Sequence, residues 1–160
     1  MLFSPRRRIV LFLEVRVVNE VDFELIKELA LLEEDVFGRG GLNEWTLPVF
    51  VRYGKVFLLE EKGKVEGSAE FIKSWSNPKL VFLAGFSIRQ NKRGKGLGSF
   101  FLEKVIGFLR EDGVKSINAT VSPFNKRALG LYEKMGFVRV GYLENEYGLG
   151  EDRLLVKLQI

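Results

Sequence analysis

The chain has 160 residues, of which 46% are hydrophobic and 29% are charged, so it suits one globular domain with a sizeable core. It contains no cysteine, which excludes a disulfide framework, thiolate metal sites and a cysteine nucleophile. It contains no histidine either, so a metal site is not expected, and proton transfer must use Glu, Asp, Tyr, Lys, a chain terminus or water.

The net charge of +4 is a small excess, and only residues 6–8 and 89–95 form basic clusters. Neither cluster has the interleaved aromatic residues that suit base stacking, so a nucleic-acid partner is not favoured. The apolar run at 9–13 is too short for the core of a signal peptide, and no stretch reaches the length of a membrane helix. We therefore expect a cytoplasmic protein without membrane contact.

In chain order, the pattern first predicts a strand at Ile9–Val18 and then a helix that ends near Phe37. Asn19 or Asp22 can cap this helix, and its expected apolar face holds Ile26, Leu29, Ala30, Val36 and Phe37. Residues 38–41 end the helix, and the stretch 42–51 is ambiguous because a proline interrupts any regular element.

Strands are predicted at 56–61 and 64–75, joined as a hairpin through Lys62-Gly63, and a further strand at 80–88. A helix at 97–110 has an expected apolar face of Leu97, Phe100, Phe101, Val105, Phe108 and Leu109. The remaining elements are a strand at 116–121, a short helix at 125–134 with Gly136 as its left-handed cap, and strands at 137–142 and 153–158. This order predicts one α/β domain with a mixed sheet.

The stretch from Phe86 to Ser99 joins a strand to a helix through a basic, glycine-rich turn. Glycines at 94, 96 and 98 allow the backbone to turn tightly and approach a ligand closely. The free N–H groups and the dipole of the following helix favour an anion, and the charge there comes from Arg89, Lys92, Arg93 and Lys95. These features predict a cradle for a phosphate or pyrophosphate, with a generic glycine-rich turn as the alternative.

The spacing in this cradle is that of neither a dinucleotide fingerprint nor a P-loop, because Ser99 stands where the third glycine belongs and no Gly-Lys-Ser/Thr follows. Arg93-x-x-Gly96-x-Gly98 instead resembles the Gln/Arg-x-x-Gly-x-Gly/Ala element of the GNAT N-acetyltransferase superfamily. A second segment, Asn125 to Phe137, matches the Asn-x-x-Ala-x-x-Leu-Tyr-x-x-x-Gly-Phe pattern of that family at every position. The resemblance covers roughly residues 9–158.

This resemblance implies the GNAT fold, with helices on both faces of a splayed mixed sheet, as a single domain over residues 1–160. It also implies acetyl-CoA as co-substrate, with the pyrophosphate in the cradle and the pantetheine arm paired like an extra strand beside the 80–88 strand. The residues implied to bind acetyl-CoA are Phe86, Ser87, Ile88, Arg93, Gly94, Lys95, Gly96, Leu97, Gly98, Ser99 and Asn125. A backbone N–H in the strand can polarise the thioester carbonyl.

The resemblance assigns Tyr132 as the general acid that protonates the departing CoA thiolate, and a pKa near 10 in water suits a proton donor at neutral pH. The alternative is a core aromatic whose hydroxyl finds a partner. An amine must be neutral to attack, so a carboxylate should take its proton, yet the strand 80–88 has no acid where some family members place a base. Glu70 and Glu66 are the candidates, and the alternative is that both face solvent from their strand.

The sequence thus predicts an acetyl-CoA-dependent N-acetyltransferase that acts, in a ternary complex, on a primary amine of a small molecule, peptide or protein N-terminus. One alternative is a degenerate relative that binds CoA without catalysis, and another is a nucleic-acid-binding module that uses the basic loop. No motif identifies the acceptor, although the acids in the 143–151 loop favour a cationic one. The assembly state stays open, a homodimer included.

Overall fold

The computed structural model describes residues 12–160, so the basic cluster at 6–8 and the start of the expected first strand lie outside the described residues. The strands of the described part are β1 Leu13–Val17, β2 Lys55–Glu61, β3 Lys64–Lys73, β4 Leu80–Ile88, β5 Ser116–Val121, β6 Val138–Leu143 and β7 Arg153–Gln159. Its helices are α2 Phe23–Phe37, α3 Leu47–Tyr53, α4 Leu97–Glu111 and α5 Lys126–Lys134, with short 3₁₀ turns η1 Gly38–Gly40 and η2 Gln90–Lys92.

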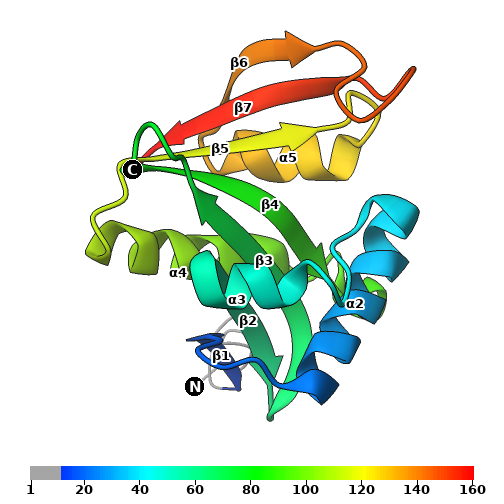
Figure 1. Ribbon diagram of the computed structural model, residues 1–160, viewed down its shortest axis with the longest axis vertical. Helices are drawn as coiled ribbons and strands as arrows, with labels where there is room; N and C mark the ends of the chain where they lie inside the picture. Colours follow the sequence, from blue (N-terminus) through cyan, green and yellow to red (C-terminus); the bar gives the residue numbers. More distant parts are fainter. Residues whose placement is uncertain (1–11) are drawn as a thin grey trace, which may run out of the picture. The chain divides into compact units, whose positions relative to one another are not determined.

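The strands form one mixed sheet in the order β1-β2-β3-β4-β5-β7-β6 (Figure 1). β4 and β5 pair in parallel, whereas β1 with β2, β5 with β7 and β6 with β7 are antiparallel. The parallel register joins Leu80–Leu83 to Ser116–Ala119 and ends there, although β4 continues to Ile88. The α/β fold with a mixed sheet is therefore confirmed.

The chain divides into two compact units, and the divisions fall within β3, within β4 and after the first residue of α4. The first unit comprises the described residues up to Glu70 together with Gly85–Leu97. The second comprises Phe71–Ala84 and Gly98–Ile160. Each unit is described by itself below, and the expectation of a single domain stays a prediction.

The first unit is built from β1, β2, most of β3, the end of β4, α2 and α3. The Asp22 carboxylate caps α2 by accepting a hydrogen bond from the Leu25 N–H at 2.8 Å, as predicted. The ambiguous 42–51 stretch contains the start of α3, and Pro48 lies in its first turn, where a missing N–H costs nothing. One apolar cluster joins α2, α3, β2 and β3, formed by Val18, Ile26, Leu29, Leu47, Val51, Val56, Leu58 and Val65.

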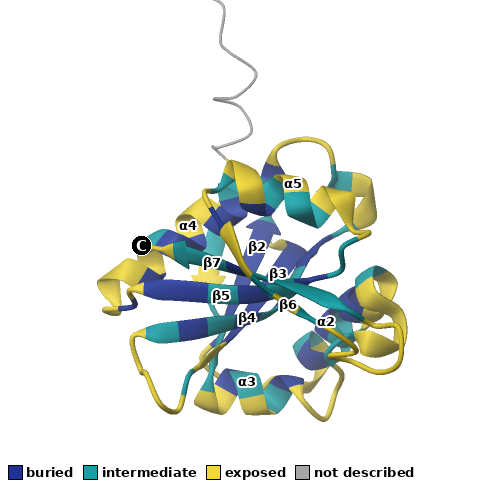
Figure 2. Cartoon of the chain, turned by 90° about the horizontal axis from the view of Figure 1, so that it is seen from above, coloured by how far each residue is buried: buried dark blue, intermediate teal, exposed yellow. Residues whose placement is uncertain are grey.

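The hairpin between β2 and β3 forms at the predicted position. Lys62 and Gly63 have φ of +52° and +77°, the pair of positive values that a type I′ turn requires. The two strands that this turn connects are deeply buried (Figure 2). Every residue of Val56–Glu60 in β2 and of Val65–Phe71 in β3 is buried. Polar residues within these runs therefore need partners inside the protein.

The second unit contains the start of β4, the strands β5, β6 and β7, and the helices α4 and α5. β7 lies between β5 and β6, and β6 is the edge strand of the sheet. The Asn125 side chain caps α5 by accepting from the Ala128 N–H at 3.1 Å, and Gly136 follows with φ of +93°. No helix within residues 12–160 is long and apolar enough to cross a membrane.

Two predicted helix faces are wrong in part. In α2 the buried residues are Ile26, Leu29, Leu32 and Glu33, whereas Phe37 is 42% exposed because it is the last helical residue before the chain turns at Gly38. In α4 the prediction includes Phe108, which is exposed, and omits two buried side chains, Leu102 and Ile106. The prediction for α2 also omits two buried residues, Leu32 and Glu33, and Glu33 is an acid.

Candidate active site

The predicted anion cradle is a loop of two tight turns between β4 and α4. After η2, Gly94 and Gly96 have φ of +76° and +78°, and α4 begins at the next residue, Leu97. A Cβ placed on either glycine would meet nothing within 4 Å, so backbone conformation and not lack of space requires glycine here. Any other residue in this left-handed conformation costs roughly 1–2 kcal/mol. The two glycines thereby set the course of the backbone that leads into the first turn of the helix.

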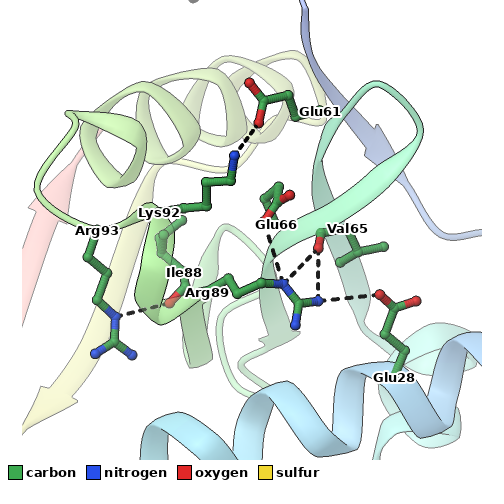
Figure 3. Close-up of polar contacts among 8 residues, drawn as sticks. All are labelled: Glu28, Glu61, Val65, Glu66, Ile88, Arg89, Lys92 and Arg93. Atoms are coloured by element: carbon green, nitrogen blue, oxygen red, sulfur yellow. Dashed lines mark hydrogen bonds and ion pairs between the residues drawn. The ribbon is translucent and has the colours of Figure 1, made fainter.

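The cations of the cradle are largely engaged with other groups of the first unit (Figure 3). Lys92 Nζ lies 2.7 Å from Glu61 Oε2, and this pairing raises the pKa of Lys92 and lowers that of Glu61. Arg89 Nη2 lies 3.3 Å from Glu28 Oε1 and donates at 3.0 Å to the Val65 carbonyl. Two of the four predicted cations, Arg89 and Lys92, are therefore each paired with an acid of the first unit.

Arg93 folds back toward the strand that precedes it. Its Nε donates to the Ile88 carbonyl at 3.0 Å, which fixes the turn between the end of β4 and the glycines (Figure 3). Lys95 forms no ion pair with any residue in 12–160. Of the four predicted cations, Lys95 and the outer nitrogens of Arg93 thus keep charge available at the cradle.

The two candidate bases on β3 do not face solvent, and that alternative is wrong. Glu66 is 2% exposed and Glu70 is fully buried, because the whole run Val65–Phe71 is covered on both faces and the alternation typical of a half-exposed strand is absent. Glu66 Oε2 lies 3.5 Å from Arg89 Nε, so a cation accompanies its charge. Within residues 12–160 no lysine or arginine forms an ion pair with Glu70.

Glu70 is instead paired with a second buried acid, Glu33 of α2, above Gly85 of β4. A Cβ on Gly85 would lie 2.8 Å from Glu33 Oε1 and closer still to a carboxyl oxygen of Glu70. Glycine at this position therefore leaves the room that the two carboxyl groups occupy. Sequence analysis did not single out Glu33, although its place seven residues after Ile26, on the apolar face of α2, was a usable signal.

The two carboxyl groups differ in their partners. Glu33 Oε1 accepts from the Ser87 hydroxyl at 2.9 Å and Oε2 accepts from the Leu42 N–H at 3.1 Å, whereas neither oxygen of Glu70 has a hydrogen-bond partner in the described chain. Burial raises the pKa of both groups, and the charge of Glu33 raises the pKa of Glu70 further, to well above its usual range. When the pair holds one proton, that proton is therefore on Glu70, and Glu33 is the ionised member.

Tyr132, the candidate general acid, belongs to the second unit. It is buried, and its ring packs against Phe137 with ring centroids 5.0 Å apart. Burial raises the pKa of its hydroxyl, and that hydroxyl forms no hydrogen bond to another residue within 12–160. The side chain thus stays protonated over the physiological pH range, and the expected structural partner of the hydroxyl is not found among the described residues.

Asn125 and the residues at the start of α4 complete the predicted set. Asn125 serves as the N-cap of α5 through its side-chain oxygen. Gly98 and Ser99 lie in the first turn of α4. Ser87 and Ile88 are buried at the end of β4, and the Ser87 hydroxyl is committed to Glu33.

Comparison with known proteins gives a consistent result. Residues 23–137, well over half of the chain, match the model of the acetyltransferase (GNAT) family. N-alpha-acetyltransferase MAK3 of Arabidopsis thaliana is 29% identical over 105 residues, which span 64% of this chain and 54% of MAK3. A Bacillus subtilis protein, YwnH, provisionally named a phosphinothricin acetyltransferase, is 32% identical over 84 residues, 51% of this chain and 52% of YwnH. The chain thus aligns with about half the length of these curated relatives.

Solved structures show the same fold at lower identity. Ard1 from Thermoplasma volcanium has a TM-score of 0.80 and 18% identity, with 92% of this chain and 97% of that chain covered. The ribosomal-protein-S18-alanine N-acetyltransferase from Escherichia coli has a TM-score of 0.76 and 22% identity, with 92% and 94% covered.

Proposed function

Because the chain belongs to the acetyltransferase (GNAT) family, we propose that it is an N-acetyltransferase that transfers the acetyl group of acetyl-CoA directly to a primary amine. The observation that carries this proposal is the cradle between β4 and α4. Gly94 and Gly96 adopt left-handed conformations immediately before the helix, where the family motif is expected to receive the pyrophosphate.

The residues present fit acetyl-CoA. The backbone N–H groups of the first turn of α4 have no intrahelical acceptor, and Arg93 and Lys95 supply positive charge beside them. On the strand side, the β4–β5 register ends at Leu83, so Phe86–Ile88 continue beyond it. That short segment is the proposed partner of the pantetheine amides. When bound, acetyl-CoA supplies an activated thioester carbonyl.

Three catalytic roles would then belong to residues of the chain: polarising the carbonyl, protonating the leaving group and accepting the proton of the amine. A backbone N–H of the Phe86–Ile88 segment polarises the carbonyl oxygen. Tyr132 donates its proton to the leaving sulfur, for which a protonated, buried hydroxyl without a hydrogen-bond partner in residues 12–160 is suited. A carboxylate takes the proton of the acceptor amine, and Glu70 belongs to a buried pair beside the same strand segment.

The alternative is a CoA-binding relative that does not catalyse transfer. The presence of Tyr132 in its complete motif argues against it, since a binding protein needs no proton donor there. The hypothesis that the basic loop binds nucleic acid is less favoured, because Arg89 and Lys92 are already paired with acids. Paired cations neutralise fewer phosphates and so release fewer counterions from a nucleic acid.

The test is product analysis by mass spectrometry. The full chain is incubated with acetyl-CoA and a panel of polyamines, aminoglycosides, amino acids and peptides with free N-termini, the last because MAK3 and the Escherichia coli neighbour are N-acetyltransferases of that kind by name. We expect an acetylated amine that is absent without protein. Binding of acetyl-CoA with no product from any amine class would favour the degenerate relative.

A further inference from the structure

We propose that Glu33 and Glu70 act as one pair that shares a proton and, through the Ser87 hydroxyl, takes up the proton of the acceptor amine; this rests on the proposed N-acetyltransferase function. Glu33 is the member that accepts the proton, and Glu70 is its neutral partner. Glu33, Glu70 and Ser87 all belong to the first unit.

The carboxyl pair lies beside the strand segment that is proposed to hold the acetyl arm. The carboxyl groups approach β4 at Gly85, the residue directly before the Phe86–Ile88 segment proposed to hold the acetyl arm. Ser87 lies inside that segment, and its Oγ donates to Glu33 Oε1 at 2.9 Å. A hydrogen-bonded route therefore runs from the segment to the pair. β4 itself has no acid, so the acids come from α2 and β3.

A second feature of the pair is its asymmetry. Glu33 accepts two hydrogen bonds, from Ser87 and from the Leu42 N–H, and donors of this kind favour an ionised carboxylate. Neither oxygen of Glu70 meets the geometry of a hydrogen bond within residues 12–160, although the residue is fully buried. The nearby Ser68 hydroxyl lowers the pKa of Glu70, but burial and the charge of Glu33 raise it more. An ionised Glu70 would be a buried charge without compensation, whereas a protonated Glu70 is itself a donor for Glu33.

A third feature is the charge around the pair. On α2 the ionisable member is Glu33, on β3 it is Glu70, and β4 presents uncharged Gly85 and Ser87. Within residues 12–160 no lysine or arginine forms an ion pair with either carboxyl group, and the nearby cation Arg89 is taken by Glu66 and Glu28. Ionisation of both carboxyl groups is therefore unfavourable, and the stable form of the pair has one protonated and one ionised carboxyl group.

The transfer balances as follows. An N–H bond of the ammonium breaks and its electron pair stays on nitrogen, which becomes the nucleophile. The proton moves to Ser87 Oγ, while the Ser87 proton moves to Glu33 and forms an O–H bond there. The pair then holds two protons and no charge, and release of one proton to water restores it.

The test compares two amines of similar shape, one strongly basic and one, such as a hydroxylamine, whose conjugate acid is largely dissociated at neutral pH. With the basic amine, Glu33→Gln and Ser87→Ala should each lower kcat/KM on the order of 10²- to 10⁴-fold, the usual worth of a positioned base. With the weakly basic amine the loss should stay under about tenfold, because no proton has to leave before attack. Glu60→Gln, a change at another buried glutamate, on β2, serves as the matched control.

Equal losses with both amines, or no loss with either, would overturn the proposal and leave the pair a packing feature. If Glu33→Gln does not fold, Ser87→Ala decides the comparison alone. If wild-type protein acetylates no amine, the proposed function fails, but the pair is still testable by infrared spectroscopy. A protonated-carboxyl stretch present at neutral pH in wild type and absent in Glu70→Gln supports the shared proton, and its absence in wild type refutes it.

Discussion

Replacement of Glu70 by glutamine should remove a pH dependence of stability that the buried pair imposes. Burial and the neighbouring Glu33 raise the pKa of Glu70 well above its usual range, so the folded protein keeps a proton that the unfolded chain releases. The folded state then binds more protons than the unfolded state at pH values above the unfolded pKa near 4.5. The free energy of unfolding must therefore fall as the pH rises from that value toward the folded pKa.

The magnitude follows from linkage. One proton held only by the folded state costs about 1.4 kcal/mol of stability per pH unit within that window. For a chain of this length, about 1 kcal/mol corresponds to a shift in Tm of roughly 2–4 °C. Glu70→Gln stays neutral at every pH and can still donate to Glu33. Its Tm should therefore rise relative to wild type by about 3–6 °C for each pH unit between about 5 and the folded pKa of Glu70.

The assay is thermal unfolding followed by circular dichroism at constant ionic strength between pH 5 and pH 9. Glu133→Gln, a change at an exposed residue of α5, is the control and should follow the wild-type curve. The change with pH of the Tm difference between Glu70→Gln and wild type tests the prediction. The amide itself shifts Tm by an amount that does not depend on pH. A difference between Glu70→Gln and wild type that does not change with pH would refute the shared proton.

Three further predictions concern the cradle and the candidate acid. Acetyl-CoA should raise the Tm of wild type by binding only the folded state, and Gly96→Glu should abolish that rise because it places an acid in the anion site; an unchanged rise in a folded variant would show that the cradle lies elsewhere. Tyr132→Phe should lower the rate constant for transfer on the order of 10²- to 10⁴-fold in a steady-state assay while Tm changes little, and near-normal turnover with chemistry limiting would exclude the acid role. Arg89→Met should lower the free energy of unfolding in urea by roughly 1–3 kcal/mol, because buried Glu66 loses its cation, and an unchanged urea midpoint would contradict that pairing.

The regular elements were readable because local signals fix them. Asp22 caps the start of α2 and Asn125 caps the start of α5, each with its side-chain oxygen. Lys62 and Gly63 form the β2–β3 turn with positive φ, which the glycine in the sequence favours. The first turn of α3 was missed because Pro48 is neutral in that turn but disruptive later in a helix.

The acid pair could be foreseen only in part. Glu70 was a candidate, but its burial was not expected, because an acid on a strand usually faces water and only the covering of β3 on both faces reverses this. Its partner Glu33 comes from a helix 37 positions earlier in the sequence, and that contact depends on how α2 packs on β3 and β4. Likewise, the ion pairs that neutralise Arg89 and Lys92 join acids of α2, β2 and β3, which no local pattern predicts.

The central claim is transfer of an acetyl group to an amine, and its most direct measurement is the stoichiometry of the reaction. Wild-type protein, acetyl-CoA labelled in the acetyl carbons and the amine identified from the panel are mixed, and free thiol and labelled product are measured over the same time course. The account predicts one labelled N-acetyl product for each CoA thiol released, at a rate that Tyr132→Phe strongly reduces. Thiol release without labelled amine, or acetyl-CoA binding with neither, would contradict it.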